Sequence, residues 1–292
     1  MTERDQTRIV WQGNAGACAG ISDVGTDRGG VDVPEFPPPW PDRPWIYGNV
    51  IASANGIVTW TRQGPHDDPL RAIAGGDFSR PGRRADARLL HTLRASAEAL
   101  AVGAQTLRDE PNLLTRPASL GAEFDAALAR FGASQARGRF PRLVVYSESG
   151  ALDLDTGVFN TADLTVVVVT TDRGAGRLRA SGSEARGIAV LVAGAHSIES
   201  SGLVHAHRCL HAEFGVRYLD CEGGMVALTA LRRAGILDEI FVTVTSGQIA
   251  PEEHHGVKRV FDFEDEAARL VAEGRTAADT GYVFRRWRFN ER

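Results

Sequence analysis

The chain has 292 residues, of which 43% are hydrophobic and 24% charged, as is ordinary for a globular protein with a sizeable core. Its formal net charge of −4 gives no reason to expect nucleic acid or an anionic membrane as a partner. No apolar run approaches the roughly 20 residues needed to span a bilayer, and the mixed-charge N-terminus does not resemble a signal peptide. The cysteines, Cys18, Cys209 and Cys221, are widely spaced and odd in number, so we expect reduced thiols in a cytoplasmic protein.

The chain is predicted to open with an arm and to continue as one folded domain. Residues 1–43 have no sustained periodicity and are rich in Gly, Asp and Pro, which predicts an extended or disordered arm. The domain is predicted to cover residues 44–292. Its first strand, 45–52, runs into a turn at residues 53–56. A polar loop over residues 61–84 follows, and loops of this length often act as lids.

Strands and helices then alternate along the chain. Asp86 is predicted to cap a helix with an apolar face at Leu89, Leu90 and Leu93. Further predicted strands cover residues 97–102, 141–146, 164–169, 188–192, 216–221, 238–245 and 282–289. Predicted helices cover residues 120–131 and 198–214, and another runs from Gly224 to a stop at Gly235. This order predicts an α/β fold with a mostly parallel central sheet flanked by helices and antiparallel strands at the C-terminal edge.

Two glycine turns follow predicted strands, one at residues 103–106 and one at Glu222-Gly223-Gly224. Glycine lets the backbone turn sharply and lets a ligand approach closely, and we expect Gly223 to adopt a φ that a β-branched residue tolerates poorly. A helix N-terminus after such a turn favours a phosphate group. The alternative is a tight turn with a solvated carboxylate. Neither Gly-x-Gly-x-x-Gly nor a Walker lysine motif is present, which argues against a Rossmann or P-loop protein.

One histidine motif resembles part of a metal site. His211-Ala212-Glu213 followed by Cys221 matches the first half of a zinc deaminase signature, but the required Pro-Cys-x-x-Cys pair is missing. We therefore expect His211 and Glu213 to lie on a helix surface and no metal to be bound. His254 and His255 lie in a polar loop and are expected to be solvated.

In this order the motifs resemble the reductase domain of riboflavin biosynthesis, which has a dihydrofolate-reductase-like fold. The motifs that carry the resemblance are Ser53-Ala54-Asn55-Gly56, Leu93-Arg94, Val102-Gly103-Ala104-Gln105-Thr106-Leu107-Arg108, Glu222-Gly223-Gly224 and Leu237-Asp238-Glu239. The match covers residues 44–292 and is specific in combination. The resemblance implies an oxidoreductase that uses NADP(H) and reduces a pyrimidine.

The resemblance also implies roles for individual residues. Residues that would hold NADP(H) are Ala52, Gly103, Thr106, Ser147, Gly223, Gly224, Met225 and Val226. Residues that would face a small-molecule substrate are Ser53, Asn55, Arg94, Leu114, Arg116 and Glu222. Glu222 would polarise or protonate the substrate, and the arginines would suit a ribose phosphate.

Two departures from the family pattern leave the substrate open. Asn55 replaces the family's aspartate, and Asn49 stands where a lysine is common. The substrate implied by the resemblance is a ribosylaminopyrimidine phosphate. The alternatives are another C=N or C=O compound, such as a pterin or a specialised metabolite, or a non-catalytic nucleotide-binding paralogue. Glu148 near the adenosine 2′-phosphate would weaken a preference for NADPH, so NADH is not excluded, and the resemblance implies a homodimer.

Overall fold

The structure is a computed structural model that describes residues 6–13, 26–27, 31–64, 66–110, 119–134 and 141–290. The chain divides into two compact units, which are described separately. The terminal unit consists of Met1–Phe36, Asn49–Thr92 and Glu239–Arg292. The central unit consists of Pro37–Gly48 and Leu93–Asp238, and strand β4 (Trp45–Ala52) contributes residues to both.

The central unit is built on parallel strands. Their order is β4, β10 (Tyr218–Cys221), β6 (Ala99–Gly103), β7 (Arg142–Tyr146), β8 (Val166–Thr170) and β9 (Ala189–Val192). Each of these strands pairs in parallel with its neighbour in this order. Every residue of β8 is buried, as expected for a Val-rich strand covered on both faces.

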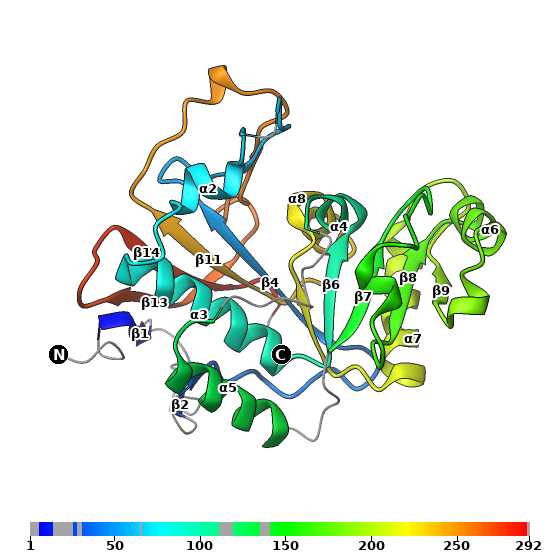
Figure 1. Ribbon diagram of the computed structural model, residues 1–292, viewed down its shortest axis with the longest axis horizontal. Coiled ribbons are helices and arrows are strands. Elements are labelled where there is room, and N and C mark those ends of the chain that lie inside the picture. The colour runs from blue at the N-terminus through cyan, green and yellow to red at the C-terminus, as the bar shows by residue number, and fades with distance from the viewer. Residues whose placement is uncertain are drawn as a thin grey trace. The chain divides into compact units, whose positions relative to one another are not determined.

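Helices cover both faces of this parallel sheet. They are α4 (Ala104–Asp109), α6 (Asp172–Ala180), α7 (Ser200–Phe214) and α8 (Gly224–Arg233). The unit also contains α5 (Ala122–Ser134) and short 3-10 helices at Gly157–Asn160 and Glu184–Arg186. Leu178 of α6 joins the core cluster that contains Val145, whereas His207 of α7 reaches the next strand residue, Tyr146. Because successive strand residues point to opposite faces, α6 and α7 cover opposite faces. Both α4 and α8 lie beside β6 (Figure 1).

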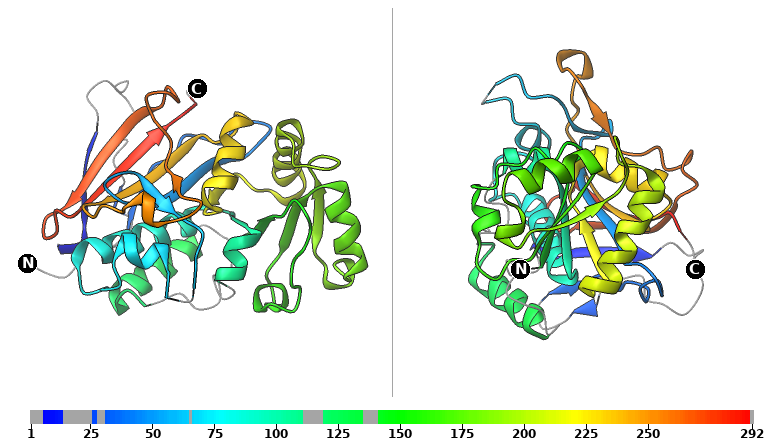
Figure 2. Two further views of the ribbon diagram at one scale, coloured as in Figure 1. Left: turned by 90° about the horizontal axis from the view of Figure 1, so that it is seen from above. Right: turned by 90° about the vertical axis from the view of Figure 1, so that its right-hand side faces the viewer.

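The terminal unit is built on antiparallel strands. Their order is β1 (Ile9–Gly13), β13 (Arg269–Thr276), β14 (Tyr282–Arg288) and β11 (Glu239–Thr245), followed by β4. In Figure 2, β1 (dark blue) and the orange and red strands β13 and β14 lie side by side. Two short ladders pair β5 (Ile57–Thr59) with β12 (Lys258–Arg259) and β2 (Thr26–Asp27) with β3 (Asp32–Val33), and a 3-10 helix covers Pro251–Glu253.

A buried charge cluster joins β11 to β14 in the terminal unit. Glu239 is fully buried, and its carboxylate accepts hydrogen bonds from Arg286 and Arg288. Arg286 also donates to the carbonyl oxygen of Glu35 at 2.9 Å, which attaches part of the N-terminal segment to β14. The two arginines compensate the buried carboxylate, so removing Glu239 would leave two neighbouring cations without this counter-charge.

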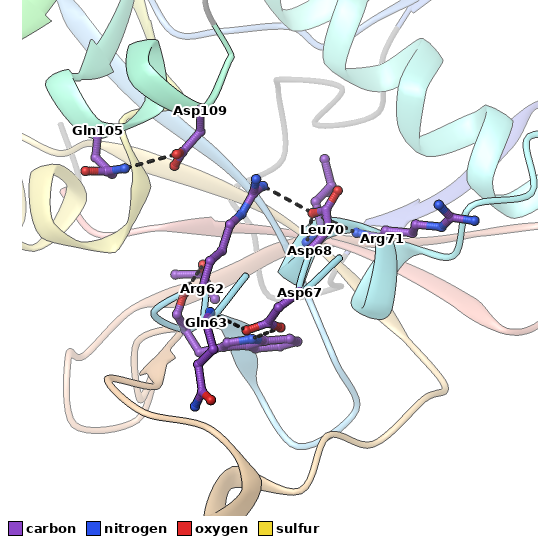
Figure 3. Close-up of polar contacts among 10 residues, drawn as sticks. Arg62, Gln63, Asp67, Asp68, Leu70, Arg71, Gln105 and Asp109 are labelled. Atoms are coloured by element: carbon purple, nitrogen blue, oxygen red, sulfur yellow. Dashed lines mark hydrogen bonds and ion pairs between the residues drawn. The ribbon is translucent and has the colours of Figure 1, made fainter. Parts of the chain in front are cut away.

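The segment predicted as one long polar loop contains two helices. Helix α2 (Pro69–Ala74) begins after Asp68, whose side chain accepts hydrogen bonds from the N–H groups of Leu70 and Arg71 (Figure 3). Helix α3 (Pro81–Ser96) begins five residues before Asp86, so the prediction that Asp86 caps it is wrong. Asp86 instead forms an ion pair with Arg83 at 2.7 Å inside the helix. The sequence did not indicate these helix starts because the segment is polar. Both helices begin at a proline and have no apolar periodicity in their first turn.

The predicted fold class is confirmed. The structure has a large, mostly parallel sheet flanked by helices, and its antiparallel strands β13 and β14 are close to the C-terminus. Elements that the sequence did not predict include β1, β5, α6 and β13. The boundary proposed near residue 43 stays a prediction. Among the described residues, none of the helices combines the length and apolar character needed to cross a bilayer.

Candidate functional site

The candidate site lies at the carboxyl ends of three neighbouring strands in the central unit. Cys221 of β10 is level with Ala101 of β6, and Gly103 of β6 is level with Tyr146 of β7. Glu222, Gly103 and Ser147 therefore follow one another along the same edge of the sheet. Carboxyl edges of parallel strands are where open α/β sheets bind ligands. The structure thus brings together most of the predicted cofactor residues.

The two glycine turns are in close contact at this edge. A Cβ atom added to Gly103 would lie 3.1 Å from the carbonyl oxygen of Gly223, and one added to Gly223 would lie 2.8 Å from the Cβ of Ala227. The expectation that Gly223 has an unusual φ is wrong, because its φ is −70°. The left-handed residue is Gly224, with φ 72°, and a Cβ there would meet nothing within 4 Å. Gly223 is required for close packing, and Gly224 for the turn.

Helix α8 starts at this turn without a side-chain cap, because its N-cap residue is Gly223. Its N-terminus presents backbone N–H groups and the positive end of the helix dipole. The space above Gly224 is open on the side where a Cβ would project. Met225 is buried and Val226 is 73% exposed, so their side chains face different surroundings. A flat or anionic group could therefore approach the backbone of this turn, as the fit of a dinucleotide requires.

The same edge carries a short, largely buried ion pair. Arg94, near the end of α3, donates from Nε to Glu222 Oε1 and from Nη2 to Glu222 Oε2, each at 2.6 Å. The two side chains are only 15% and 10% exposed. Glu222 is held in place because its own N–H also donates to the carbonyl oxygen of Ala101. The two residues expected to face the substrate are therefore each other's partners.

One acidic residue that the sequence reading assigned no role lies beside this pair. Asp220 is fully buried in β10, two residues before Glu222. Burial raises the pKa of Asp220 well above its usual value, and the charge of Glu222 adds to this effect, whereas Arg94 opposes it. An acid in the middle of an otherwise apolar strand was the signal for this residue. On the other face of the strand, burial raises the pKa of the Cys221 thiol to about 12, so it is inert.

A second buried polar pair supports the opposite face of the sheet. The Tyr146 hydroxyl and His207 Nε2 are 2.9 Å apart, and His207 Nδ1 lies 2.7 Å from the carbonyl oxygen of Leu203. Burial lowers the pKa of His207 to about 4, so the imidazole is neutral at physiological pH. One ring nitrogen donates to Leu203 and the other accepts from Tyr146, which satisfies both buried groups.

Three of the predicted site residues belong to the terminal unit. They are Ala52, Ser53 and Asn55. The Asn55 side chain donates to the carbonyl oxygen of Ile249 at 2.7 Å and accepts from the N–H of Ile249 at 3.2 Å. Its Oδ1 also accepts from the Ser53 hydroxyl at 2.7 Å. An amide can donate and accept in this arrangement, whereas an ionised aspartate can only accept. This difference gives a structural reason for asparagine at this position.

The remaining predictions concern other residues. Leu114 and Arg116 lie outside the described residues. His211 is half-buried on α7 and Glu213 is exposed, as expected. Within the described part of the chain, no group of three or more His, Cys, Asp or Glu side chains could hold a metal ion. The expectation that His254 is simply solvated is wrong, because its ring stacks on Trp60 with centroids 4.0 Å apart.

Comparison with known families and structures places this site in context. Residues 44–249 match the RibD C-terminal domain family. A pyrimidine reductase-like protein from Corynebacterium diphtheriae is 25% identical, with a TM-score of 0.57, and the alignment covers 86% of this chain and 94% of that one. Comparison with curated proteins gives no match.

Two further solved structures share the fold at lower identity. RibD from Acinetobacter baumannii is 16% identical with a TM-score of 0.56, and the alignment covers 85% of this chain and 58% of that one. A riboflavin biosynthesis reductase from Saccharomyces cerevisiae is 14% identical with a TM-score of 0.53, covering 84% of this chain and 90% of that one.

Proposed function

Because the chain belongs to the RibD C-terminal domain family, we propose that it is an NADPH-dependent reductase of a ribosylaminopyrimidine phosphate. The reaction is hydride transfer to the ribose C1′, which opens the ribose to a ribityl chain. One observation carries this proposal beyond the family match. The paired glycine turns at Gly103 and Gly223 lie at the same strand edge as the Arg94–Glu222 ion pair.

The cofactor side of the site is formed by the turns after β6, β7 and β10. Gly103, Thr106, Ser147, Gly223 and Gly224 would hold the nucleotide, with backbone N–H groups facing its phosphates. The bound cofactor supplies the hydride. Met225 contributes through its backbone, because its side chain is buried, whereas Val226 offers an exposed apolar surface. Ala52 stays a proposed contact of the terminal unit.

The substrate side is formed by Arg94 and Glu222. The carboxylate fixes the plane of the guanidinium through the two hydrogen bonds at Nε and Nη2. A fixed, planar cation suits a phosphate group, because both have matching bidentate geometry. Glu222 in turn is proposed to orient or protonate the acceptor. Ser53, Asn55, Leu114 and Arg116 remain proposed substrate contacts.

The direct test is a reductase assay with the purified chain. NADPH or NADH is mixed with the ribosylaminopyrimidine phosphate, and loss of reduced nicotinamide absorbance is followed together with mass detection of the ribityl product. We expect turnover that depends on the substrate. The proposal would be abandoned if neither cofactor were oxidised while both the substrate and the fold were shown to be intact.

A matched pair of arginine variants tests the substrate role of Arg94. Arg94→Lys keeps the charge and loses the planar fork, so KM should rise while NADPH affinity stays the same. Arg208→Lys is the control, because Arg208 forms an ion pair with Asp42 in which both side chains are more than half exposed. A loss of NADPH affinity in Arg94→Lys, without a change in KM, would assign Arg94 to the cofactor instead.

Oligomeric state and cellular location complete the proposal. We propose a homodimer in the cytoplasm, as the family resemblance implies. Cys209 and Cys221 are free thiols, which is consistent with a reducing compartment. Light scattering coupled to size-exclusion chromatography would measure the mass in solution, and a monomer at all concentrations would contradict the dimer. Cell fractionation would test the location.

A further inference from the structure

Asp220 lies on the same side of the sheet as the Arg94–Glu222 pair. Glu222 directly follows β10 and continues its pairing with β6, because its N–H donates to the carbonyl oxygen of Ala101; Asp220 and Glu222, two residues apart, therefore share a face. The residues level with Asp220 are Tyr47 of β4 and Leu100 of β6. The Tyr47 hydroxyl donates to the carbonyl oxygen of Leu93 at 2.7 Å, which places this face against the end of α3 that carries Arg94.

The Asp220 carboxyl group lacks the partners that a buried carboxylate needs. Neither of its oxygens receives a hydrogen bond from an N–H or O–H donor in the described part of the chain. The neighbouring carboxyl group of Glu222 raises the pKa of Asp220 both through its charge and as a hydrogen-bonding group. Two carboxyl groups can form a hydrogen bond only when one of them carries a proton. Arg94 already binds both oxygens of Glu222 and stabilises its ionised form, so the proton belongs on Asp220.

We propose that Asp220 is a protonated carboxylic acid that donates a hydrogen bond to Glu222 and stores the proton consumed in the reduction. The proposal rests on the proposed function, because the proposed reduction consumes this proton. Asp220 acts through Glu222 and is thus a positioning residue. Its full burial and the neighbouring Glu222 charge both favour its neutral form, in agreement with the raised pKa.

The proton and the electron pair balance in this scheme. The ribose C1′ gains a hydride from the reduced nicotinamide, the bond between C1′ and the ring oxygen breaks, and that oxygen takes up one proton. The proton passes from Asp220 to Glu222 and from Glu222 to the departing oxygen. Arg94 then faces the new Asp220 carboxylate until solvent returns a proton.

The surrounding groups define which charges act on Asp220. Glu222 comes from its own strand, Arg94 from α3, and Tyr47 from β4, while β6 presents the apolar Leu100. Glu110, which follows α4, acts on Arg94. Arg94 is the cation that opposes protonation of Asp220, and its charge is already offset by Glu222.

Infrared spectroscopy tests the stored proton without any activity measurement. The protein is produced with aspartate that carries carbon-13 in its side-chain carboxyl group. The carbonyl stretching band of the protonated acid is then recorded at neutral pH. We expect a band that is lost in Asp220→Asn and retained in Cys221→Ala. Cys221 is the matched control, because it is the adjacent buried residue on the opposite face of the strand. A wild-type spectrum without a protonated aspartate band would overturn the proposal.

A second variant is needed because burial also raises the pKa of Asp86, so that Asp86 is another candidate for the band of a protonated aspartate. Asp86→Asn should keep the band that belongs to Asp220. This variant also keeps the test decisive if Asp220→Asn fails to fold, because loss of the band in Asp86→Asn would assign the proton to Asp86 and overturn the proposal.

Kinetics then test the use of the proton. Asp220→Asn keeps the shape and a donor toward Glu222 but holds no transferable proton, so kcat should fall by about 10²–10⁴, as expected for loss of acid catalysis. NADPH affinity should be unchanged, and the fall of kcat at alkaline pH that we expect for the wild type should be absent from the variant. A wild-type pH profile in the variant would refute the relay. If the wild type shows the infrared band but reduces no substrate, the proposed function fails and the protonated Asp220 stands.

Discussion

Breaking the Arg94–Glu222 pair should destabilise the central unit by far more than breaking an exposed pair. Glu222→Gln removes the negative charge and turns an amide N–H toward a guanidinium N–H. Arg94, only 15% exposed, is then left without its counter-charge. Loss of one partner from a buried pair lowers the free energy of unfolding by about 3–5 kcal/mol. Because both side chains keep some exposure, we expect a loss of about 3 kcal/mol here.

A double-mutant cycle isolates the pair from other effects of the substitutions. The free energy of unfolding is measured in urea for the wild type, Glu222→Gln, Arg94→Gln and the double variant. Because the double variant leaves no buried charge without a partner, it should lose less stability than the two single losses added together. We expect a coupling free energy of about 2–3 kcal/mol.

An exposed pair of similar length provides the control. Arg186 and Asp155 lie 2.7 Å apart in the same unit, but Asp155 is 85% exposed. Asp155→Asn should therefore cost about 0–1 kcal/mol. A coupling energy for Arg94 and Glu222 as small as the effect of this control would refute the reasoning, because it would show that water screens the pair.

Three further predictions concern other parts of the structure. Gly103→Val should abolish NADPH binding in a fluorescence titration, since even a Cβ lies 3.1 Å from Gly223, whereas Gly132→Ala, which meets nothing within 4 Å, should bind normally. The folded His207 pKa of about 4 lies below its ordinary 6.5, so unfolding takes up a proton between these values. Stability should fall by about 3 kcal/mol as pH drops through this window, and His207→Gln should remove that slope in urea titrations. Asn55→Asp should cost about 1–3 kcal/mol, because the Ile249 carbonyl loses its donor, and unchanged stability with higher activity would instead assign Asn55 to the substrate.

Much of the parallel sheet could be predicted because its strands carry a strong local signal. The run ending in Thr170 is continuously Val-rich, and its strand is buried along its whole length. The strands of the terminal unit carry weaker signals. In β13, polar and charged residues alternate with few large apolar ones, because one face is only partly buried. Its pairing with β14 through six register positions stabilises it, and sequence periodicity does not show such contacts.

The glycine turns could be located from sequence, but their conformations could not. The motif Glu222-Gly223-Gly224 predicts a turn at a strand end, which is what the structure shows. It does not say which glycine is left-handed. That choice follows from the packing of α8, because Ala227 excludes a Cβ at Gly223 while the position of Gly224 is open.

The relation between the charged residues of the site depends on contacts between distant segments. Arg94 and Glu222 are separated by 128 positions, and motif comparison assigns each of them to the substrate separately. The fold makes them partners instead, because the end of α3 lies beside the carboxyl end of β10, where Glu222 follows the strand. Asp220 illustrates the same limit. A buried strand was predicted to contain it, and an acid there should carry a partner or a proton. Only the contact with Glu222, whose oxygens Arg94 already binds, decides in favour of the proton. A substrate phosphate that draws Arg94 away from Glu222 would release the carboxyl group from its fixed position, so that substrate binding and proton delivery become coupled through one short ion pair.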